Sequence, residues 1–92
     1  MSGPIRQELK IVNVKGLHAR ASAKFVEAVE EHDATATVYK DGLSAAGDSI
    51  MGLLMLAASV GTTIEVETRG PDADALAGAL AALVADKFGE GM

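Results

Sequence analysis

The spacing of apolar residues along this sequence changes between that of a β-strand and that of an α-helix. The strand-like segments in which apolar and polar residues clearly alternate have one polar face. Residues 6–13 alternate between polar and apolar side chains, with Leu9 and Ile11 on the same side. Residues 63–68 alternate in the same way. Strands of this kind are typical of an antiparallel sheet that is covered on one face only. The pattern therefore predicts an open sheet with all helices on its other face.

A β-hairpin is predicted in the middle of the chain. Residues 35–40 are rich in β-forming residues, and Asp41-Gly42 directly after them is a strong hairpin signal. Residues 43–46 are expected to form the short second strand of the hairpin. This hairpin and the two alternating segments together supply four strands.

Helices are predicted between and after these strands. The first begins at Ala19 and is expected to end near His32-Asp33, because its polar residues repeat at helical spacing. The second is a short helix over residues 49–56 that is apolar nearly all round, and Gly61 is expected to stop it. The third spans residues 72–88, and its predicted buried stripe consists of Leu76, Leu80, Leu83 and Val84.

These segments predict one fold. We expect an α/β (α+β) two-layer open-faced sandwich, in which a four-stranded antiparallel sheet carries three helices on one face in the order β-α-β-β-α-β-α. A chain of 92 residues has room for a single domain, so residues 1–92 are treated as one unit.

Composition and charge exclude several classes of function. The chain has no cysteine, which excludes disulfides, thiolate metal sites and a thiol nucleophile, and no metal site or cofactor is expected. The net charge of −5 argues against a general nucleic-acid binder. The start of the chain lacks the apolar region of a secretory signal, and the apolar stretch at 50–60 is too short for a membrane span, so we expect a cytoplasmic protein.

The charge is unevenly distributed along the chain. Residues 1–24 carry five basic side chains and one carboxylate, Glu8, whereas the acidic residues are concentrated in the remainder. A local positive field in an acidic protein indicates a site for an anion or an acidic partner, although a few solvated lysines on an edge strand would give the same count.

His18 is the first candidate for chemistry. It lies where the first strand gives way to a helix, so its ring is expected beside backbone N–H groups that have no intrahelical partner. The positive end of the helix disfavours a cationic ring and stabilises an anion, such as a phosphoryl group, built onto a ring nitrogen. Arg20 is placed to add a charge-assisted hydrogen bond to that group. A surface histidine that only caps the helix is the plain alternative, although histidine is not a favoured N-cap residue.

Two segments carry a resemblance to a known family. Gly16-Leu17-His18-Ala19-Arg20 resembles the active-site signature of HPr, the histidine phosphocarrier family of the bacterial phosphoenolpyruvate-dependent phosphotransferase system, and Ser49-Ile50-Met51-Gly52 resembles the serine-bearing segment of that family. The spacing of the two segments and the order of elements also fit. The resemblance extends over almost the whole chain.

The resemblance implies a function and its partners. Enzyme I would pass a phosphoryl group to Nδ1 of His18, which would donate it to a histidine of an IIA-type protein, with Arg20 beside the phosphoryl group. Such a protein is a carrier and a substrate of other enzymes, and is expected to work as a monomer. Ala21 departs from the proline that most members have, from which we expect a small change in rigidity only. Features around residues 63–71 lean towards a nitrogen-type or α-proteobacterial regulatory branch rather than a sugar-transport branch.

Ser49 is the second candidate. A serine at a helix start is ordinarily an N-cap, and Asp48 is equally able to fill that position. The resemblance implies in addition that Ser49 matches the serine modified by HPr kinase/phosphorylase in bacteria that have this enzyme. Phosphorylation there is expected to place negative charge on a docking surface and to weaken partner binding.

A partner-binding surface is predicted near His18. The short second helix is too apolar to bury all its residues, and methionines suit a surface that meets several partners. The predicted surface consists of Lys24, Ile50, Met51, Leu54 and Met55. For each of the four apolar residues taken singly, burial in the core is an equally good explanation.

Two other classes of function remain as alternatives. A small-ligand-sensing or protein-interaction module on a related fold would explain the apolar helix, but gives no reason for His18 beside Arg20. A small phosphohydrolase would need a second polar catalytic group, for which Asn13 is the only candidate nearby. His32 is assigned no role, because it follows two glutamates at a helix C-terminus, where its ring suits the helix dipole.

Overall fold

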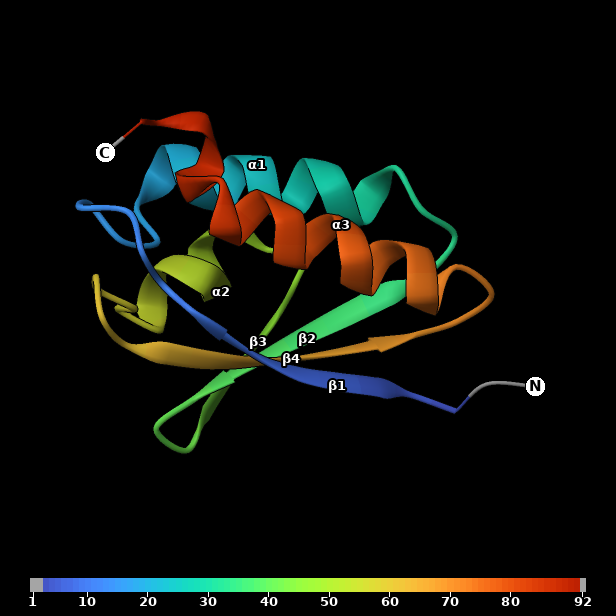
Figure 1. Ribbon diagram of the computed structural model, residues 1–92. Helices are drawn as coiled ribbons and strands as arrows, with labels where there is room; N and C mark the ends of the chain where they lie inside the picture. Colours follow the sequence, from blue (N-terminus) through green and yellow to red (C-terminus); the bar gives the residue numbers. More distant parts are fainter. Residues whose placement is uncertain (1–2, 92) are drawn as a thin grey trace.

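The computed structural model of the protein describes residues 3–91 and has two layers. One layer is an antiparallel sheet and the other consists of three α-helices, all on the same face of the sheet (Figure 1). The elements in chain order are β1 (Ile5–Lys10), α1 (Ala19–Glu30), β2 (Thr35–Lys40), β3 (Leu43–Ala46), α2 (Ile50–Met55), β4 (Thr63–Arg69), α3 (Ala73–Ala85) and the 3-10 turn η1 (Lys87–Gly89). The predicted fold class and element order are confirmed.

The sheet has the order β1-β4-β2-β3, so the last strand of the chain inserts between the first strand and the hairpin. Leu9 on β1 pairs with Ile64 on β4, and Val66 on β4 pairs with Val38 on β2. These paired apolar residues face the helices and are buried or half-buried, whereas β1 exposes every second residue. The alternation seen in the sequence is therefore the alternation between the core face and the open face.

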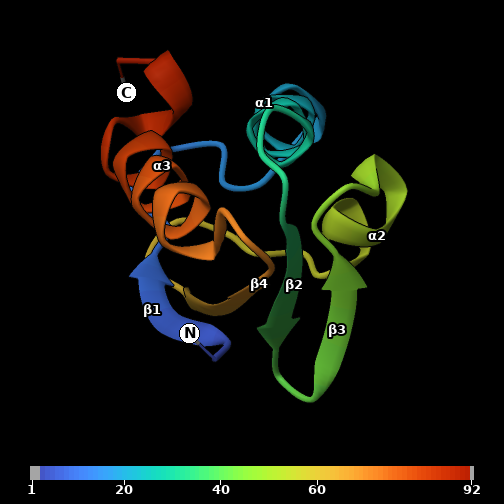
Figure 2. The same cartoon turned by 90° about the vertical axis from the view of Figure 1, so that its right-hand side faces the viewer.

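The three helices divide the covered face of the sheet among them. In Figure 2, α3 lies above β1 and β4, and α2 lies beside the end of β3. Helix α1 lies between these two helices in the same view. The helical layer contributes several of the largest fully buried side chains, namely Phe25 from α1, Leu53 from α2, Leu76 and Leu80 from α3, and Phe88 from η1. With few aromatic residues in the chain, Phe25 and Phe88 fill much of the core.

The hairpin forms where it was predicted. Asp41 and Gly42 both have positive φ, +51° and +81°, which is the backbone that a two-residue primed turn requires. The turn joins Lys40 to Leu43, which face each other in the register of β2 and β3.

All three helices end slightly before the predicted positions, by one to three residues. Helix α1 ends at Glu30 rather than at His32-Asp33. Helix α2 ends at Met55, one residue before the predicted end, and what stops it is Ala57 rather than Gly61, because Ala57 adopts a positive φ of 52° and turns the chain away. Helix α3 ends at Ala85 rather than at Phe88, and this difference has the largest consequence for the site.

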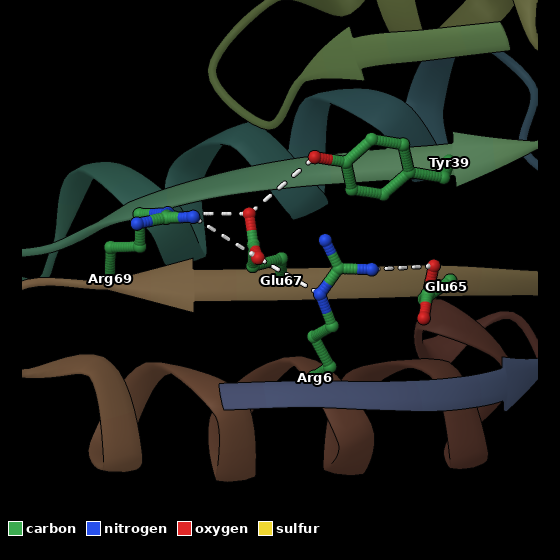
Figure 3. A network of polar contacts seen from close by, with 5 residues as sticks. All are labelled: Arg6, Tyr39, Glu65, Glu67 and Arg69. Atoms are coloured by element: carbon green, nitrogen blue, oxygen red, sulfur yellow. Dashed lines mark hydrogen bonds and ion pairs between the residues drawn. The ribbon is translucent and has the colours of Figure 1, made fainter. Parts of the chain in front are cut away.

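The open face of the sheet carries a network of charged side chains around Glu67 (Figure 3). The guanidinium of Arg6 donates through Nε to Glu67 at 2.9 Å, and Arg69 donates to both oxygens of the same carboxylate at 3.3 Å. The Glu67 side chain is only 5% exposed, and although this burial alone raises its pKa, the hydrogen bonds from Arg69 and Arg6 outweigh that effect and lower it. The network stabilises the exposed face without reaching the His18 end of the molecule.

Candidate functional site

His18 is the N-cap residue of α1, as predicted. Its backbone is extended, with φ −80° and ψ −175°, and its carbonyl oxygen accepts the first intrahelical hydrogen bond, from the N–H of Ser22 at 2.8 Å. The first-turn N–H groups before Ser22 have no intrahelical partner. The imidazole is 27% exposed and makes no capping hydrogen bond to the helix. A partly exposed imidazole therefore lies at the open N-terminal end of the helix.

The turn before His18 depends on Gly16. Gly16 has a φ of +66°, and a Cβ added to it would lie 2.5 Å from the carbonyl oxygen of Ala58. That same oxygen accepts a 2.8 Å hydrogen bond from the N–H of Leu17. No side chain larger than hydrogen fits this approach, so the glycine fixes the position from which His18 enters the helix.

Glu90 is a charged partner of His18 that no sequence pattern predicted. One carboxylate oxygen of Glu90, Oε2, contacts Nε2 of His18. The other, Oε1, accepts a 2.9 Å hydrogen bond from Nδ2 of Asn13. The Glu90 side chain is only 8% exposed. A buried carboxylate thus contacts one nitrogen of a partly exposed imidazole.

The break after α3 is what brings Glu90 to His18. Lys87 and Phe88 have positive φ values of 56° and 54°, so the chain reverses direction instead of continuing as a helix. Phe88 is fully buried, and its burial offsets the strain of a left-handed backbone at a bulky residue. As a result, the C-terminal segment returns to the end of the molecule where α1 begins (Figure 1).

Asn13 holds the carboxylate in place. The Asn13 side chain is fully buried, and its Nδ2 donates to the carbonyl oxygen of Gly16 at 2.8 Å as well as to Glu90. Its Oδ1 is buried without a hydrogen-bond partner among the described residues. Asn13 therefore joins the turn before His18 to the C-terminal segment.

The surroundings of Glu90 favour its ionised form. The hydrogen bond from Asn13 lowers the pKa of Glu90, burial opposes this shift, and the contacts with His18 and the positive charge of Lys15 reinforce it. The net effect is a pKa below the ordinary glutamate value, so the carboxylate is charged at neutral pH.

Arg20 lies in the first turn of α1, two residues after His18. Its side chain is exposed, and it forms no ion pair with any residue in the part of the chain that the structure describes. The guanidinium is thus available to an external anion. Its predicted role beside a phosphoryl group stays a prediction.

Ser49 is the N-cap residue of α2, and Asp48 is not. The hydroxyl oxygen of Ser49 accepts a 3.0 Å hydrogen bond from the N–H of Gly52. An added Cβ at Gly52 would lie 3.1 Å from that oxygen, so the glycine leaves room for the cap. The serine is half-buried at the start of a helix whose other residues include the predicted docking residues.

The predicted partner-binding residues divide into two groups. Ile50, Met51 and Met55 are exposed, with 39%, 69% and 75% of their surface accessible. Leu54 is half-buried and lines a hollow beside His18, together with Lys15, Leu17, Ala57, Ala58 and Ser59. We name the exposed apolar residues and Leu54 the α2 patch.

Lys24 is engaged within the protein. Its Nζ donates a 2.6 Å hydrogen bond to the carbonyl oxygen of Phe88. The ammonium therefore ties α1 to the segment that carries Glu90, and its predicted contact with a partner stays a prediction. Sequence reasoning also missed the exposed Val12 and Val14, which lie in the loop before His18.

The second histidine has a structural contact. Nδ1 of His32 donates a 2.7 Å hydrogen bond to the carbonyl oxygen of Ala28 at the end of α1. Residues 3–91 contain no group of three or more His, Asp or Glu side chains arranged to hold a metal ion. Within the same residues, no helix has the length and apolar character needed to cross a membrane.

A known protein family matches most of this chain. The family model described as "PTS HPr component phosphorylation site" matches residues 5–86. The chain belongs to the HPr family. Members of this family are phosphocarrier proteins of the phosphotransferase system and not catalysts, which favours the phosphocarrier prediction over a ligand-sensing module or a phosphohydrolase.

Individual relatives cover nearly the whole chain. The phosphocarrier protein HPr of Cupriavidus necator is 41% identical over 87 residues, which are 95% of this chain and 98% of the relative. The phosphocarrier protein NPr of Shewanella violacea is also 41% identical, over 94% of each chain. Both names occur among the relatives, so the predicted lean towards a regulatory branch stays a prediction.

Solved structures of HPr proteins share the fold. The crystal structure of HPr-C-His from Thermoanaerobacter tengcongensis superposes with a TM-score of 0.90 at 33% identity, over 96% of this chain and 99% of that one. An HPr from Bacillus anthracis superposes with a TM-score of 0.85 at 34% identity, over 90% and 99% of the two chains. Glu90, which contacts His18, lies outside residues 5–86, the span matched by the family model.

Proposed function

We propose that His18 accepts a phosphoryl group from phosphorylated Enzyme I on its Nδ1 nitrogen and donates it to a histidine of an IIA-type protein. The observation that carries this proposal is the position of the ring: it is partly exposed at the N-cap of α1, and Nε2 but not Nδ1 is occupied by a contact within the described residues. An acceptor needs such a ring nitrogen whose lone pair is not occupied by another contact.

The transfer is a displacement at phosphorus. The Nδ1 lone pair forms the new N–P bond while the bond between phosphorus and the donor nitrogen breaks, and its electron pair returns to the donor ring. Negative charge spreads over the three phosphoryl oxygens during this step. The open N–H groups of the first turn of α1 and the exposed guanidinium of Arg20 are placed to stabilise that charge.

The α2 patch supports a docking role. Leu54 lines the hollow beside His18, and the exposed residues of the patch belong to the same helix, so a partner that covers the patch and the hollow would also exclude water from the phosphoryl group. A flexible methionine-bearing surface suits a carrier that must bind a donor and an acceptor in turn.

Regulation at Ser49 follows from the same surface. Phosphorylation would add a charge of about −1.5 to −2 at the start of α2, where the helix dipole tolerates it. Because Ser49 adjoins Ile50 and Met51, that charge would fall within the α2 patch and oppose the docking of a partner. The modifying enzyme would be an HPr kinase/phosphorylase. Cytoplasmic location and a monomeric state complete the proposal as the family resemblance implies them.

The direct test is phosphorylation by Enzyme I and phosphoenolpyruvate, followed by intact-mass analysis. The wild-type protein is expected to gain one phosphoryl group that is lost in acid, as a phosphoramidate is. His18→Ala is expected to gain none, whereas His32→Ala serves as the matched control and is expected to behave as the wild type does. Unchanged labelling of His18→Ala would overturn the proposal.

A further inference from the structure

We propose that Glu90 is a positioning residue for His18: its carboxylate keeps the ring proton on Nε2, so that the lone pair lies on Nδ1, the nitrogen that makes no contact within the described residues. This inference deepens the proposed phosphoryl transfer and names a residue that neither of the two sequence motifs contains. It also gives a function to the reversal of the chain after α3.

The first step concerns what each atom is able to donate. A carboxylate has no proton to give, so Oε2 of Glu90 is only an acceptor. The contact between Oε2 and Nε2 therefore requires that Nε2 carries the hydrogen. In a neutral imidazole the other nitrogen, Nδ1, then holds the free lone pair. The identity of the nucleophilic nitrogen thus follows from the partner of the opposite one.

The second step concerns how firmly the carboxylate is held. Its other oxygen accepts from Nδ2 of Asn13 at 2.9 Å, and Asn13 is itself oriented by a 2.8 Å hydrogen bond to the carbonyl oxygen of Gly16. The chain on the other side of Glu90 is fixed by the buried ring of Phe88 and by the hydrogen bond from Lys24. A buried, doubly anchored carboxylate orients the imidazole in the way that outer partners orient a metal-binding or catalytic histidine.

The third step concerns the phosphorylated state. With phosphorus on Nδ1 and hydrogen on Nε2, the ring is a cation, and Glu90 is its counter-charge. When the phosphoryl group leaves, the electron pair of the N–P bond returns to Nδ1 and the ring becomes neutral again, with the proton still on Nε2. Glu90 thus holds the proton in the same place through acceptance and donation. The positive charge of Lys15 nearby helps to keep the carboxylate ionised when the ring is neutral.

The test reverses the direction of the hydrogen bond between residue 90 and His18. In Glu90→Gln, Nδ2 of Asn13 still needs an acceptor, so the amide oxygen would turn towards Asn13 and the amide NH2 towards Nε2. Nε2 would then become the acceptor and the ring proton would move to Nδ1. The isosteric change is therefore expected to reverse the tautomer, whereas Glu90→Ala is expected to leave a mixture.

The readout is the ¹⁵N chemical shift of the two ring nitrogens of His18, measured at a pH high enough that the shifts no longer change. Wild type is expected to show an N–H signal at Nε2 and a lone-pair signal at Nδ1, with the two exchanged in Glu90→Gln. Asp86→Asn is the matched control, because Asp86 is an exposed carboxylate of the same segment that does not contact His18, and it is expected to leave both signals unchanged.

The kinetic readout is the rate of phosphoryl acceptance from Enzyme I, which is expected to fall by about tenfold or more in Glu90→Gln. Equal tautomer populations in wild type and Glu90→Gln would overturn the role of Glu90, whatever the transfer rates. If the wild type shows the expected tautomer but accepts no phosphoryl group from Enzyme I, the proposed function fails while the effect of Glu90 on the ring stands. The two claims are thus decided separately.

Discussion

The ammonium group of Lys24 donates a 2.6 Å hydrogen bond to the carbonyl oxygen of Phe88, and this contact joins α1 to the C-terminal segment. It explains how the left-handed turn at residues 87–88 is held in place. An added Cβ at Gly89 would lie 3.2 Å from the same ammonium, so the chain passes close to it. The position of Glu90 beside His18 therefore depends on a side chain of the helix that His18 begins.

Removing this contact is expected to lower stability modestly. Lys24→Met keeps the length of the side chain but leaves the Phe88 carbonyl without its donor, and we expect the free energy of unfolding to fall by about 1 kcal/mol. Urea denaturation measures the change. Lys10→Met is the control, because Lys10 is an exposed lysine on β1, and a loss in the control as large as that in Lys24→Met would contradict this account.

Substitution of Gly16 is expected to be far more costly. Gly16→Ala combines a positive φ of 66° with a Cβ that would lie 2.5 Å from the carbonyl oxygen of Ala58. We expect a loss of about 3 kcal/mol, from the backbone strain and the displacement of Ala58 together. Gly61→Ala has a similar φ of +88° but meets no atom within 4 Å, so about 1 kcal/mol is expected there. Thermal denaturation of both variants separates the clash from the strain, and equal losses would show that the close approach has no effect.

The fold was predictable from the sequence because its strands and turns have local causes. Asp41-Gly42 specifies a turn on its own, and alternation assigns each strand a core face. The end of α3 has no such local signal: residues 72–88 are helical in pattern, but burial of Phe88 in the core favours a left-handed turn over another helical turn. Glu90 was missed for the same reason, since a helix continued through Phe88 would have carried it elsewhere.

The Glu67 network makes stability depend on pH. Because Glu67 has a lowered pKa in the folded protein, the unfolded chain binds more protons at acidic pH, and stability rises with pH there. This contribution is fully present above the unfolded value of about 4.3 and is lost as the pH falls through the folded pKa. Glu67→Gln removes the titration, so its stability is expected to fall less steeply on acidification than that of the wild type.

Denaturation midpoints measured from neutral pH down to about pH 3 show this difference. Glu8→Gln is the control, because Glu8 is an exposed carboxylate on β1. This variant is expected to lose stability on acidification as steeply as the wild type does. A Glu67→Gln profile parallel to that of the wild type would mean that another carboxylate is responsible.

Arg20→Ala tests whether the guanidinium stabilises the phosphoryl group. Because Arg20 is exposed and forms no ion pair within residues 3–91, stability is expected to change by less than about 0.5 kcal/mol. Phosphoryl acceptance from Enzyme I is expected to slow by about tenfold, and Arg20→Lys to recover only part of the rate, since a lysine offers charge without the planar pair of donors. Rates equal to those of the wild type in rapid-quench measurements would remove Arg20 from the site.

Two substitutions of Ser49 separate its effect on the stability of the protein from its effect on binding to Enzyme I. Ser49→Ala removes the oxygen that accepts from Gly52 at 3.0 Å, so it is expected to cost about 1 kcal/mol of stability and to leave binding to Enzyme I unchanged. Ser49→Asp keeps a capping oxygen but adds a negative charge beside the α2 patch, so it is expected to retain stability and to weaken binding by roughly tenfold. Calorimetric titration with Enzyme I and thermal denaturation measure the two effects, and equal affinity of Ser49→Asp and Ser49→Ala would show that charge at this position does not regulate docking.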